Sequence, residues 1–350
     1  MCVPDKLSKS ARCTTVKSLC TTPYEEVFTL DKLFEAYRQV RKGKGHRDRV
    51  QHYDRIAGDD LPRLLHELQT FTYKPRPCNE FYIWCTAGQK RRLVQAPAYR
   101  DLIVQRVLYN LLYPVFDKGF IYDSYGCRTG KGAKRASDRV HEFMRQVSPD
   151  SYYLQIDIRK YYYSMDRGHI REALERRITD QRIIDLVLSY TQDVGVCVGS
   201  ILAQFFGMLY LDVLDHYVKR VLKIKRYVRY VDDMVFIGLS KQQAHSILSL
   251  VQQRLSHICL GLSKWHILPL RRGINFCGYR MWHRMRLIRK RSLRVFTRRL
   301  KAHAWQAIES ILGHAEHTAS YRHLRKLLAE ASCPMPEHIL RRINNGCLFL

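Results

Sequence analysis

The sequence predicts an α+β fold, and three observations lead to this prediction. Apolar residues recur at helical spacing in several segments, for example at Leu30, Leu33, Phe34 and Tyr37. Short apolar runs paired across turns predict strands between these helices. With 350 residues and a hydrophobic content of 46%, the chain can form about two domains, or one divided globule with a real core.

The first half of the chain is expected to be mainly helical. Residues 1–28 form an N-terminal arm, the start of which is rich in Ser, Thr and Lys. Helical periodicity begins near Thr29 and returns over 59–70, 99–116 and 133–146. A hairpin is predicted over 81–94, with its turn at Ala87-Gly88. Basic, glycine-containing loops are expected at 41–49 and 125–132.

The second half alternates strands and helices. A strand over 152–158 and a strand–turn–strand unit over 226–238 each carry aspartate, and one long amphipathic helix is expected between them, over 201–222. The remaining predicted elements are a helix over 241–257, strands over 273–280 and 284–289, and helices over 291–312 and 318–330.

The charge of the chain indicates a polyanionic partner. The 60 Lys and Arg residues exceed the 32 Asp and Glu residues, which gives a net charge of +28. Nucleic acid is the first candidate partner and an anionic membrane the second. No apolar run approaches the roughly 18 residues of a membrane span, and no secretory signal is expected. The 11 cysteines include no CxxC pair, which favours reduced cytosolic thiols.

This charge is concentrated in the C-terminal half of the chain. No acidic residue lies between Asp233 and Glu309, and residues 264–301 contain thirteen Lys and Arg residues. Aromatic residues are interleaved with these cations, among them Trp265 and Trp282. Such a pattern suits a nucleic-acid strand in a groove. A solvated face with ordinary core aromatics is the alternative.

Three carboxylates stand at the ends of predicted strands. Asp157 ends one strand, and Asp232 and Asp233 lie at the tip of a hairpin. If these strands are adjacent, the carboxylates meet and repel one another unless divalent metal lies between them. Two Mg²⁺ ions about 4 Å apart can bind both oxygens of an in-line phosphoryl displacement. A bare Asp-Asp pair is also an ordinary turn sequence.

The order of these motifs resembles that of a reverse transcriptase from about residue 24 to about residue 301. Lys90-Arg91-Arg92 resembles the first fingers motif, and SYGCRTGKGAKRA, with Arg128 and Lys131, the second. LQIDIRKYY resembles motif A, VGSILAQFF motif B, and YVDD at 230–233 motif C. Lys264 in GLSKW resembles the motif D lysine, and INFCGYR at 274–280 resembles the primer grip.

The resemblance implies a right-hand polymerase fold with an antiparallel palm sheet and a helical thumb. The implied parts are the arm (1–28), fingers with the start of the palm (29–150), a palm (151–288) and a basic thumb (289–350). No nuclease or maturase segment is expected after the thumb.

The resemblance also implies roles for individual residues. Asp157, Asp232 and Asp233, with the Ile158 carbonyl, would bind two Mg²⁺ ions, for which Mn²⁺ would substitute. Lys264 would protonate the leaving pyrophosphate, although a solvated lysine is the alternative. Residues implied to bind the dNTP are Arg92, Arg128, Lys131, Ile158, Tyr162 and Gln204. Tyr162 would be the steric gate that excludes a 2′-OH, with neighbouring Tyr161 as the alternative. Template or primer contacts are implied for Gly199, Phe276, Gly278, Tyr279, Arg289, Lys290, Arg291 and Arg298.

Within this family, the sequence resembles bacterial enzymes of diversity-generating retroelements and of antiphage defence. Ala203 stands where the retroelement enzymes usually have Ser, and Cys197 where they usually have Pro. We therefore expect an RNA-directed DNA polymerase that serves antiphage defence in a ribonucleoprotein with a non-coding RNA. The alternatives are a mutagenic retroelement enzyme, an RNA-dependent RNA polymerase and a catalytically silent RNA-binding scaffold.

The expected partners are a template or non-coding RNA, dNTPs and the DNA product. An accessory protein or a second reverse transcriptase subunit is a further expected partner, and a membrane is not. The expected location is the cytoplasm of a bacterium, with the gene carried by the bacterium or by a phage.

Overall fold

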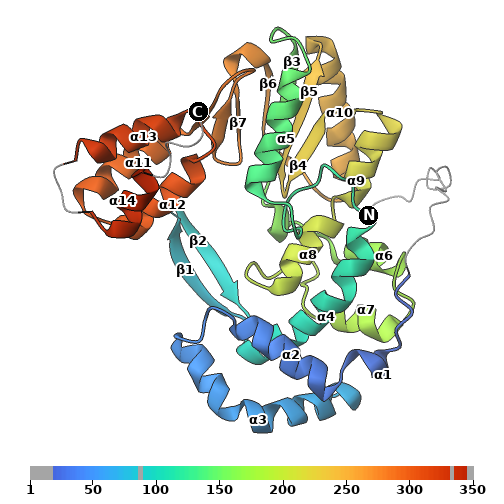
Figure 1. Ribbon diagram of the computed structural model, residues 1–350. Helices are drawn as coiled ribbons and strands as arrows, with labels where there is room; N and C mark the ends of the chain where they lie inside the picture. Colours follow the sequence, from blue (N-terminus) through green and yellow to red (C-terminus); the bar gives the residue numbers. More distant parts are fainter. Residues whose placement is uncertain (1–18, 86–89, 332–334, 345–350) are drawn as a thin grey trace. The chain divides into compact units, whose positions relative to one another are not determined.

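A computed structural model describes residues 19–85, 90–331 and 335–344 and divides into two compact units. Unit 1 comprises the chain up to Phe120 together with Tyr162–Tyr210. Unit 2 comprises Ile121–Tyr161 together with the chain from Leu211 onward. Each unit is therefore built from two separate stretches of sequence (Figure 1).

Unit 1 is mainly helical and is organised around a central helix. It contains α1 (Tyr24–Val27), α2 (Leu30–Arg41), α3 (Asp48–Gln69), α4 (Tyr99–Asp117), α6 (Arg167–Glu175), α7 (Gln181–Leu188) and α8 (Ile201–Leu209). Helix α4 packs against both α2 and α8. Its buried residues include the consecutive pairs Ile103-Val104 and Val107-Leu108, which is typical of a helix covered on more than one side.

Helix α3 is longer than the sequence predicted. The prediction placed a loop over 41–49 and a helix over 59–70, whereas the helix begins at Asp48. Val50, Tyr53 and Ala57 extend the buried stripe N-terminally from Leu61 at spacings of three and four residues. This buried stripe supports the additional turns.

A β-hairpin in unit 1 confirms the prediction over 81–94. Strands β1 (Asn79–Cys85) and β2 (Lys90–Ala96) are antiparallel, with Asn79 opposite Ala96. The predicted turn at Ala87-Gly88 lies outside the described residues.

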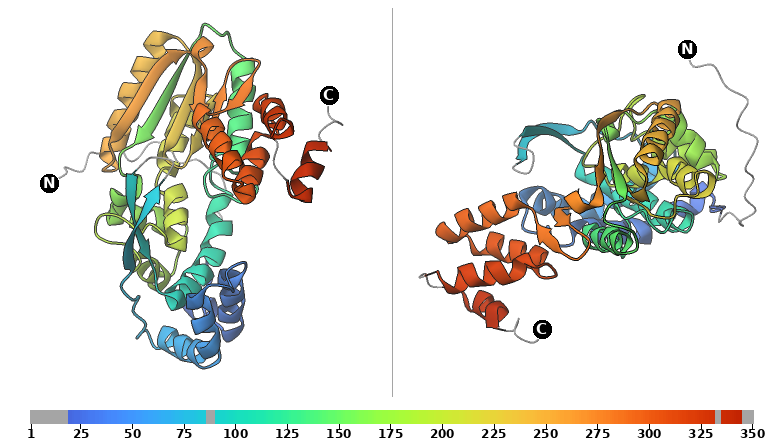
Figure 2. Two further views of the ribbon diagram at one scale, coloured as in Figure 1. Left: turned by 90° about the vertical axis from the view of Figure 1, so that its left-hand side faces the viewer. Right: turned by 90° about the horizontal axis from the view of Figure 1, so that it is seen from above.

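Unit 2 contains a four-stranded antiparallel sheet with helices packed against it (Figures 1 and 2). Its strands are β3 (Tyr152–Ile158), β4 (Tyr227–Tyr230), β5 (Asp233–Leu239) and β6 (Leu262–Pro269), in the order β4-β5-β3-β6. Helix α5 (Ala133–Arg145) packs against β4 and β5, and α10 (Lys241–His257) against β3, β5 and β6. Val235 and Ile237, alternate residues of β5, share a core cluster with Val140 and Phe143 of α5.

The edge strand β6 was not predicted from the sequence. It pairs with β3 along its whole length, although Ser263, Lys264, Trp265 and His266 are all exposed. An edge strand of this kind lacks the apolar alternation that identifies a half-buried strand. Strand β6 therefore forms because it pairs with β3, and its own sequence pattern does not predict it.

The single helix predicted over 201–222 is divided in three. Helix α8 ends at Leu209, α9 spans Asp212–His216, and a π-helical turn follows over Tyr217–Val221. The Leu222 N–H donates to the Tyr217 carbonyl at 3.0 Å, which closes this wider turn. The apolar stripe gave no sign of the breaks, because it continues through them.

A three-stranded antiparallel sheet and four helices complete unit 2. The elements are β7 (Ile274–Phe276), β8 (Tyr279–Met281), β9 (Arg286–Ile288), α11 (Lys290–Lys301), α12 (Trp305–Ala315), α13 (Ser320–Ala329) and α14 (Glu337–Asn344). The strand predicted over 273–280 is two strands, because Cys277 and Gly278 turn with φ angles of 47° and 88°. The helix predicted over 291–312 is interrupted at His303, whose φ is 51°. Within the described part of the chain, no helix has the length and apolar character needed to cross a bilayer.

Candidate active site

Two aspartates meet across adjacent strands of the unit 2 sheet. Asp157 is the penultimate residue of β3 and lies directly opposite Asp233, the first residue of β5. Directly opposed residues point to the same face of a sheet. Asp232 directly precedes Asp233 and is the second residue of the two-residue turn that joins β4 to β5. The pairing therefore gathers three carboxyl groups at one end of the sheet.

The electrostatics of this cluster suit a divalent cation. Burial, reinforced by Asp157 and Asp232, raises the pKa of Asp233 to about 7. Gln155 Nε2 opposes this effect by donating to Asp233 Oδ1 at 2.9 Å. A carboxyl group held close to two others is stabilised when a cation compensates their charge. Hard oxygen donors are also the ligands that Mg²⁺ prefers, so the described residues fit such an ion.

The neighbouring strand β6 supplies further groups next to Asp157. On β6, Ser263 donates to Asp157 Oδ2, and Lys264 lies directly opposite Asp157 with its side chain exposed. Ile158 follows Asp157 at the point where the register between β3 and β6 shifts. The structure thus brings together Asp157, Asp233 and Lys264 on three adjacent strands.

The two cations of the 125–132 loop bind carbonyl groups of the residues just before it. Arg128 Nη1 donates to the carbonyls of Ile121 and Ser124 at 2.7 and 3.1 Å. Lys131 Nζ donates to the Tyr122 carbonyl at 2.9 Å and lies 3.4 Å from the centre of the Tyr122 ring. In this structure, both side chains hold the loop closed.

Tyr162, in unit 1, is the half-exposed member of three consecutive tyrosines. Tyr161 is buried and Tyr163 is exposed. The Tyr162 ring lies against Gly207 of α8, where an added Cβ would come within 2.8 Å of the Tyr162 hydroxyl oxygen. The absence of a side chain at Gly207 therefore lets this ring pack against the helix.

The segment before α8 is fixed against the β1–β2 hairpin. Gly199 has a φ of 133°, and an added Cβ would lie 2.5 Å from the Gln95 carbonyl oxygen. Gln204 is the exposed residue of α8, all of which is described, while neighbouring Ala203 is buried. Arg92 lies on β2 opposite Ile83, and its side chain is outside the described residues.

The β7–β8 hairpin presents its turn rather than its aromatic rings. The Phe276 side chain is fully buried, and Tyr279 is buried and stacked on His314 with ring centres 4.2 Å apart. The prediction that Phe276 and Tyr279 contact a primer does not fit this burial. The side chains of this hairpin that are not buried are those of Asn275 and Arg280, together with the turn at Cys277 and Gly278.

Helix α11 and the position before it carry exposed cations. Arg289, Lys290, Arg291 and Arg298 are all exposed, whereas Phe296 of the same segment is buried. Arg289 also lowers the pKa of Asp233, against the larger raising effect of burial. The basic segment therefore begins near the carboxylate cluster, within unit 2.

Sequence reasoning missed Gln155 and Ser263, which hold two of the carboxylates, and Arg229, which lies next to the YVDD turn. A period of two places Gln155 on the same face of β3 as Asp157, which was a usable signal. Ser263 had no such signal, because β6 was not predicted.

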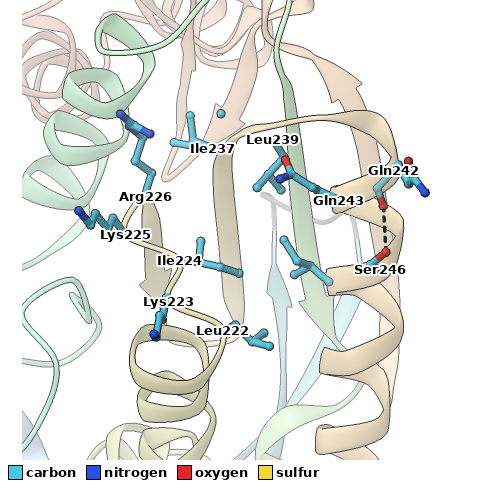
Figure 3. Close-up of a pocket in the computed structure, with 12 residues that line it drawn as sticks. Leu222, Lys223, Ile224, Lys225, Arg226, Ile237, Leu239, Gln242, Gln243 and Ser246 are labelled. Atoms are coloured by element: carbon cyan, nitrogen blue, oxygen red, sulfur yellow. Dashed lines mark hydrogen bonds between the residues drawn. The ribbon is translucent and has the colours of Figure 1, made fainter.

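A cavity of about 580 Å³ lies elsewhere in unit 2 (Figure 3). It is lined by Leu222–Arg226, by Ile237–Leu239 at the far end of β5 from Asp233, and by the first turns of α10. None of its lining residues is acidic. It is therefore separate from the carboxylate cluster and offers no carboxylate ligands for a metal ion.

Comparisons with known proteins agree with this arrangement. The group II intron-encoded protein LtrA of Lactococcus lactis subsp. cremoris is 20% identical over 240 residues, covering 64% of this chain and 39% of LtrA. Protein YkfC of Escherichia coli (strain K12) is 26% identical over 282 residues, covering 67% of this chain and 72% of YkfC. The chain thus spans about two fifths of LtrA.

Among solved structures, telomerase from Candida albicans in complex with a TWJ fragment of telomeric RNA has a TM-score of 0.50 and 14% identity. This likeness covers 79% of this chain and 54% of that chain. It supports a right-hand polymerase fold with an antiparallel sheet.

Residues 74–281 match the family model described as reverse transcriptase (RNA-dependent DNA polymerase). Members of this family generally use divalent metal ions. Since the match covers more than half of the chain, the chain belongs to the reverse transcriptase (RNA-dependent DNA polymerase) family.

Proposed function

We propose that this protein is an RNA-directed DNA polymerase whose active site is the cluster of Asp157, Asp232 and Asp233. The observation that carries the proposal is the pairing of Asp157 with Asp233 across β3 and β5, next to a turn that holds Asp232. Family membership supports the reaction, and the carboxylate cluster supports its location.

In this proposal the carboxylates, with the Ile158 carbonyl, hold two Mg²⁺ ions, for which Mn²⁺ can substitute. These ions would stabilise charge on the attacking and leaving oxygens of phosphoryl transfer. Ser263 and Gln155 hold the carboxylates in place by donating hydrogen bonds to Asp157 and Asp233. Lys264, exposed on β6 opposite Asp157, donates a proton to the departing pyrophosphate.

Roles in nucleotide selection are proposed for individual residues. The Tyr162 ring, supported by Gly207, would exclude a ribose 2′-OH, and the exposed Gln204 would contact the nucleotide. Arg92, Arg128 and Lys131 would bind the triphosphate. For Arg128 and Lys131, this requires exchange of the carbonyl contacts that they make with the residues just before their loop.

Template and primer contacts are assigned to two glycine-bearing turns and to basic residues of α11 and of the position before it. Gly199 and Gly278 would let the protein backbone approach the nucleic-acid strand closely. Its phosphates would be contacted by the exposed side chains of Arg289, Lys290, Arg291 and Arg298. This assignment divides the chain into an arm (1–28), fingers (29–150), a palm (151–288) and a thumb (289–350). Its partners are template RNA, dNTPs and the DNA product.

Primer extension on an RNA template tests the activity. With Mg²⁺, the wild-type protein should incorporate dNTPs in preference to NTPs, and EDTA should stop incorporation. Asp157→Asn and Asp232→Asn should reduce incorporation to background while leaving RNA affinity within about twofold, because the phosphate contacts that dominate affinity lie elsewhere.

The other outcomes identify competing functions. Preferential NTP incorporation would identify an RNA-dependent RNA polymerase. Unaltered incorporation by either aspartate variant would overturn the site assignment. RNA binding without any incorporation by the wild type would identify a scaffold.

For the biological role, we propose antiphage defence in a ribonucleoprotein with a non-coding RNA, with or without an accessory subunit. The support is the pair of departures at Ala203 and Cys197 from the residues usual in diversity-generating retroelements. The Cys197 thiol donates to the Gln95 carbonyl at 3.2 Å, a contact that proline cannot make. Sequencing the co-purifying RNA and testing phage sensitivity of a deletion strain would decide between defence and mutagenic retrohoming.

A further inference from the structure

A fully buried ion pair lies beside the YVDD turn. Arg229 of β4 is 1% exposed and Asp215 of α9 is 0% exposed. Arg229 Nε donates to Asp215 Oδ1 and Oδ2, both at 2.9 Å, and Nη2 donates to Oδ2 at 2.6 Å. Tyr227 Oη also donates to Asp215 Oδ1, at 2.7 Å. Both carboxylate oxygens are thus occupied, and the guanidinium plane is fixed.

The same guanidinium contacts the turn itself. Arg229 Nη1 donates to the Val231 carbonyl oxygen at 3.1 Å. Val231 has a φ of 57°, a left-handed conformation that is unfavourable for a β-branched residue. Such a conformation is unfavourable by itself and persists only where the surroundings hold it. The hydrogen bond from Arg229 is one of the contacts that hold it.

The 121–132 loop holds the turn through other contacts. A Cβ added at Gly126 would lie 2.6 Å from Val231 Cγ2 and 2.7 Å from the Val231 nitrogen. The Arg229 main chain donates to the Asp123 carbonyl at 3.0 Å and accepts from the Tyr125 N–H at 2.9 Å. The β4 backbone is therefore fixed up to Arg229, and the guanidinium extends this support to the turn.

We infer that Arg229, oriented by Asp215, is a positioning residue that sets the direction of the Asp232 carboxylate. The Val231 carbonyl and the Asp232 N–H belong to one planar peptide group, so holding the carbonyl restricts the backbone from which Asp232 projects. An apolar pair of equal volume would fill the same space but could not donate to Val231. The inference rests on the proposed role of Asp232 as a metal ligand.

The test separates positioning from stability by removing both charges at once. Removing one partner of a buried ion pair leaves the other charge buried and unpaired, which destabilises the fold. Replacing both partners by apolar residues often leaves stability unchanged. Arg229→Met/Asp215→Leu should therefore remain folded, with a melting temperature close to that of the wild type. We expect a loss of about 10- to 100-fold in kcat and in Mn²⁺ affinity, as is usual when the support of a metal ligand is removed. The KM for dNTP and the affinity for RNA should not change.

Mn²⁺ binding is measured by electron paramagnetic resonance titration, which does not depend on polymerase activity. The Asp232→Asn variant shows the Mn²⁺ affinity expected when the Asp232 carboxylate is missing. Arg229→Lys is the second variant, since lysine can pair with Asp215 but lacks the planar fork that also reaches the Val231 carbonyl. It should show the same losses in kcat and Mn²⁺ affinity even if the double variant does not fold.

Arg100→Met/Glu67→Leu provides the control. Arg100 in unit 1 is 7% exposed and donates to both oxygens of Glu67 at 2.6 and 2.9 Å. Losing this pair should change neither kcat per folded molecule nor Mn²⁺ affinity, whatever its effect on stability. Wild-type kcat and Mn²⁺ affinity in folded Arg229 variants would overturn the inference. Absence of incorporation by the wild type would instead count against the proposed function, and the Mn²⁺ titration would still report on the positioning of Asp232.

Discussion

At the scale of single residues, side-chain volume next to backbone determines much of the candidate site. The Tyr162 ring packs where Gly207 has no side chain, and Gly199 approaches the Gln95 carbonyl as closely as a glycine can. Both positions were selected from the sequence by resemblance. The packing partners Gly207 and Gln95 were visible only in the folded chain, because contacts distant in sequence leave no periodic signal.

Shortening the proposed gate should relax sugar selection. Tyr162→Ala should raise the ratio of kcat/KM for NTPs to that for dNTPs by about 10- to 100-fold, since removing a steric contact of this kind changes discrimination by a few kcal/mol. Single-nucleotide incorporation measures the ratio. Tyr163→Ala, at the exposed neighbour, serves as the control. A ratio that rises equally in both variants would argue against Tyr162 as the gate.

A methyl group at Gly199 should destabilise the segment before α8. Gly199→Ala places a Cβ 2.5 Å from the Gln95 carbonyl oxygen and retains a φ of 133° that alanine disfavours. We expect a loss of about 2 kcal/mol or more in the free energy of unfolding. Gly58→Ala is the matched control, because it lies within α3 with no atom within 4 Å of its added Cβ. This second change should stabilise the protein by up to about 1 kcal/mol. Equal effects of the two substitutions would contradict the steric explanation.

At the scale of elements, periodicity predicted those segments that bury one regular face. The helix predicted over 241–257 coincides with α10 (Lys241–His257), whose Ser240 and Gln243 form a capping box. The edge strand β6 and the division of 201–222 were not predicted. Strand β6 forms because it pairs with β3. The segment 201–222 is divided by local turns that do not interrupt its apolar stripe.

The cap of α7 predicts a pH-dependent contribution to stability. Asp180 accepts hydrogen bonds from the Arg182 and Tyr24 main-chain N–H groups, each at 2.9 Å. The Arg182 side chain and these N–H groups lower the pKa of Asp180 to about 2. Because this pKa is below the ordinary value of 3.8, the contribution is present above about pH 4 and is lost as the pH falls through 2.

Asp180→Asn should therefore cost about 1–2 kcal/mol of unfolding free energy at pH 7. The difference from the wild type should shrink as the pH falls from 4 toward 2. Urea unfolding of both proteins across this pH range measures the difference in unfolding free energy. The exposed Asp59→Asn in α3 controls for the general loss of one negative charge. If the Asp180 difference stayed constant down to pH 2, the predicted link between the cap and its ionised carboxylate would be wrong.

At the scale of the whole molecule, the position of the charge is more informative than its total. The net charge is +28, and the stretch between Asp233 and Glu309 contains no acidic residue. In unit 2 this stretch runs from β5 through α10, β6, the three-stranded sheet and α11 to the start of α12. The exposed cations at the start of α11 therefore belong to the same unit as the carboxylate cluster.

This distribution predicts which cations determine RNA affinity. Arg289→Gln/Lys290→Gln/Arg291→Gln should weaken RNA binding and reduce the slope of log affinity against log salt by about 2, since each lost phosphate contact removes about 0.7 for a single strand. Fluorescence anisotropy with a labelled RNA measures both quantities. Arg47→Gln/Arg55→Gln/Arg63→Gln removes three exposed arginines at or within α3 of unit 1 and should change the slope less. Equal slopes in the two triple variants would indicate that net charge alone governs binding.

The sequence by itself determined the α+β class, most helices, the acid-free basic segment and the identities of the three aspartates. These features are carried by periodicity, composition and motif order, which are properties of neighbouring residues. Only the tertiary structure decided that Asp157 faces Asp233 and Lys264 on adjacent strands, and that Phe276 and Tyr279 are buried. It alone placed the Arg229–Asp215 pair against the YVDD turn. Which strands become neighbours, and which single side chains they bury, depends on partners distant in the sequence, so the pattern within one segment does not specify them.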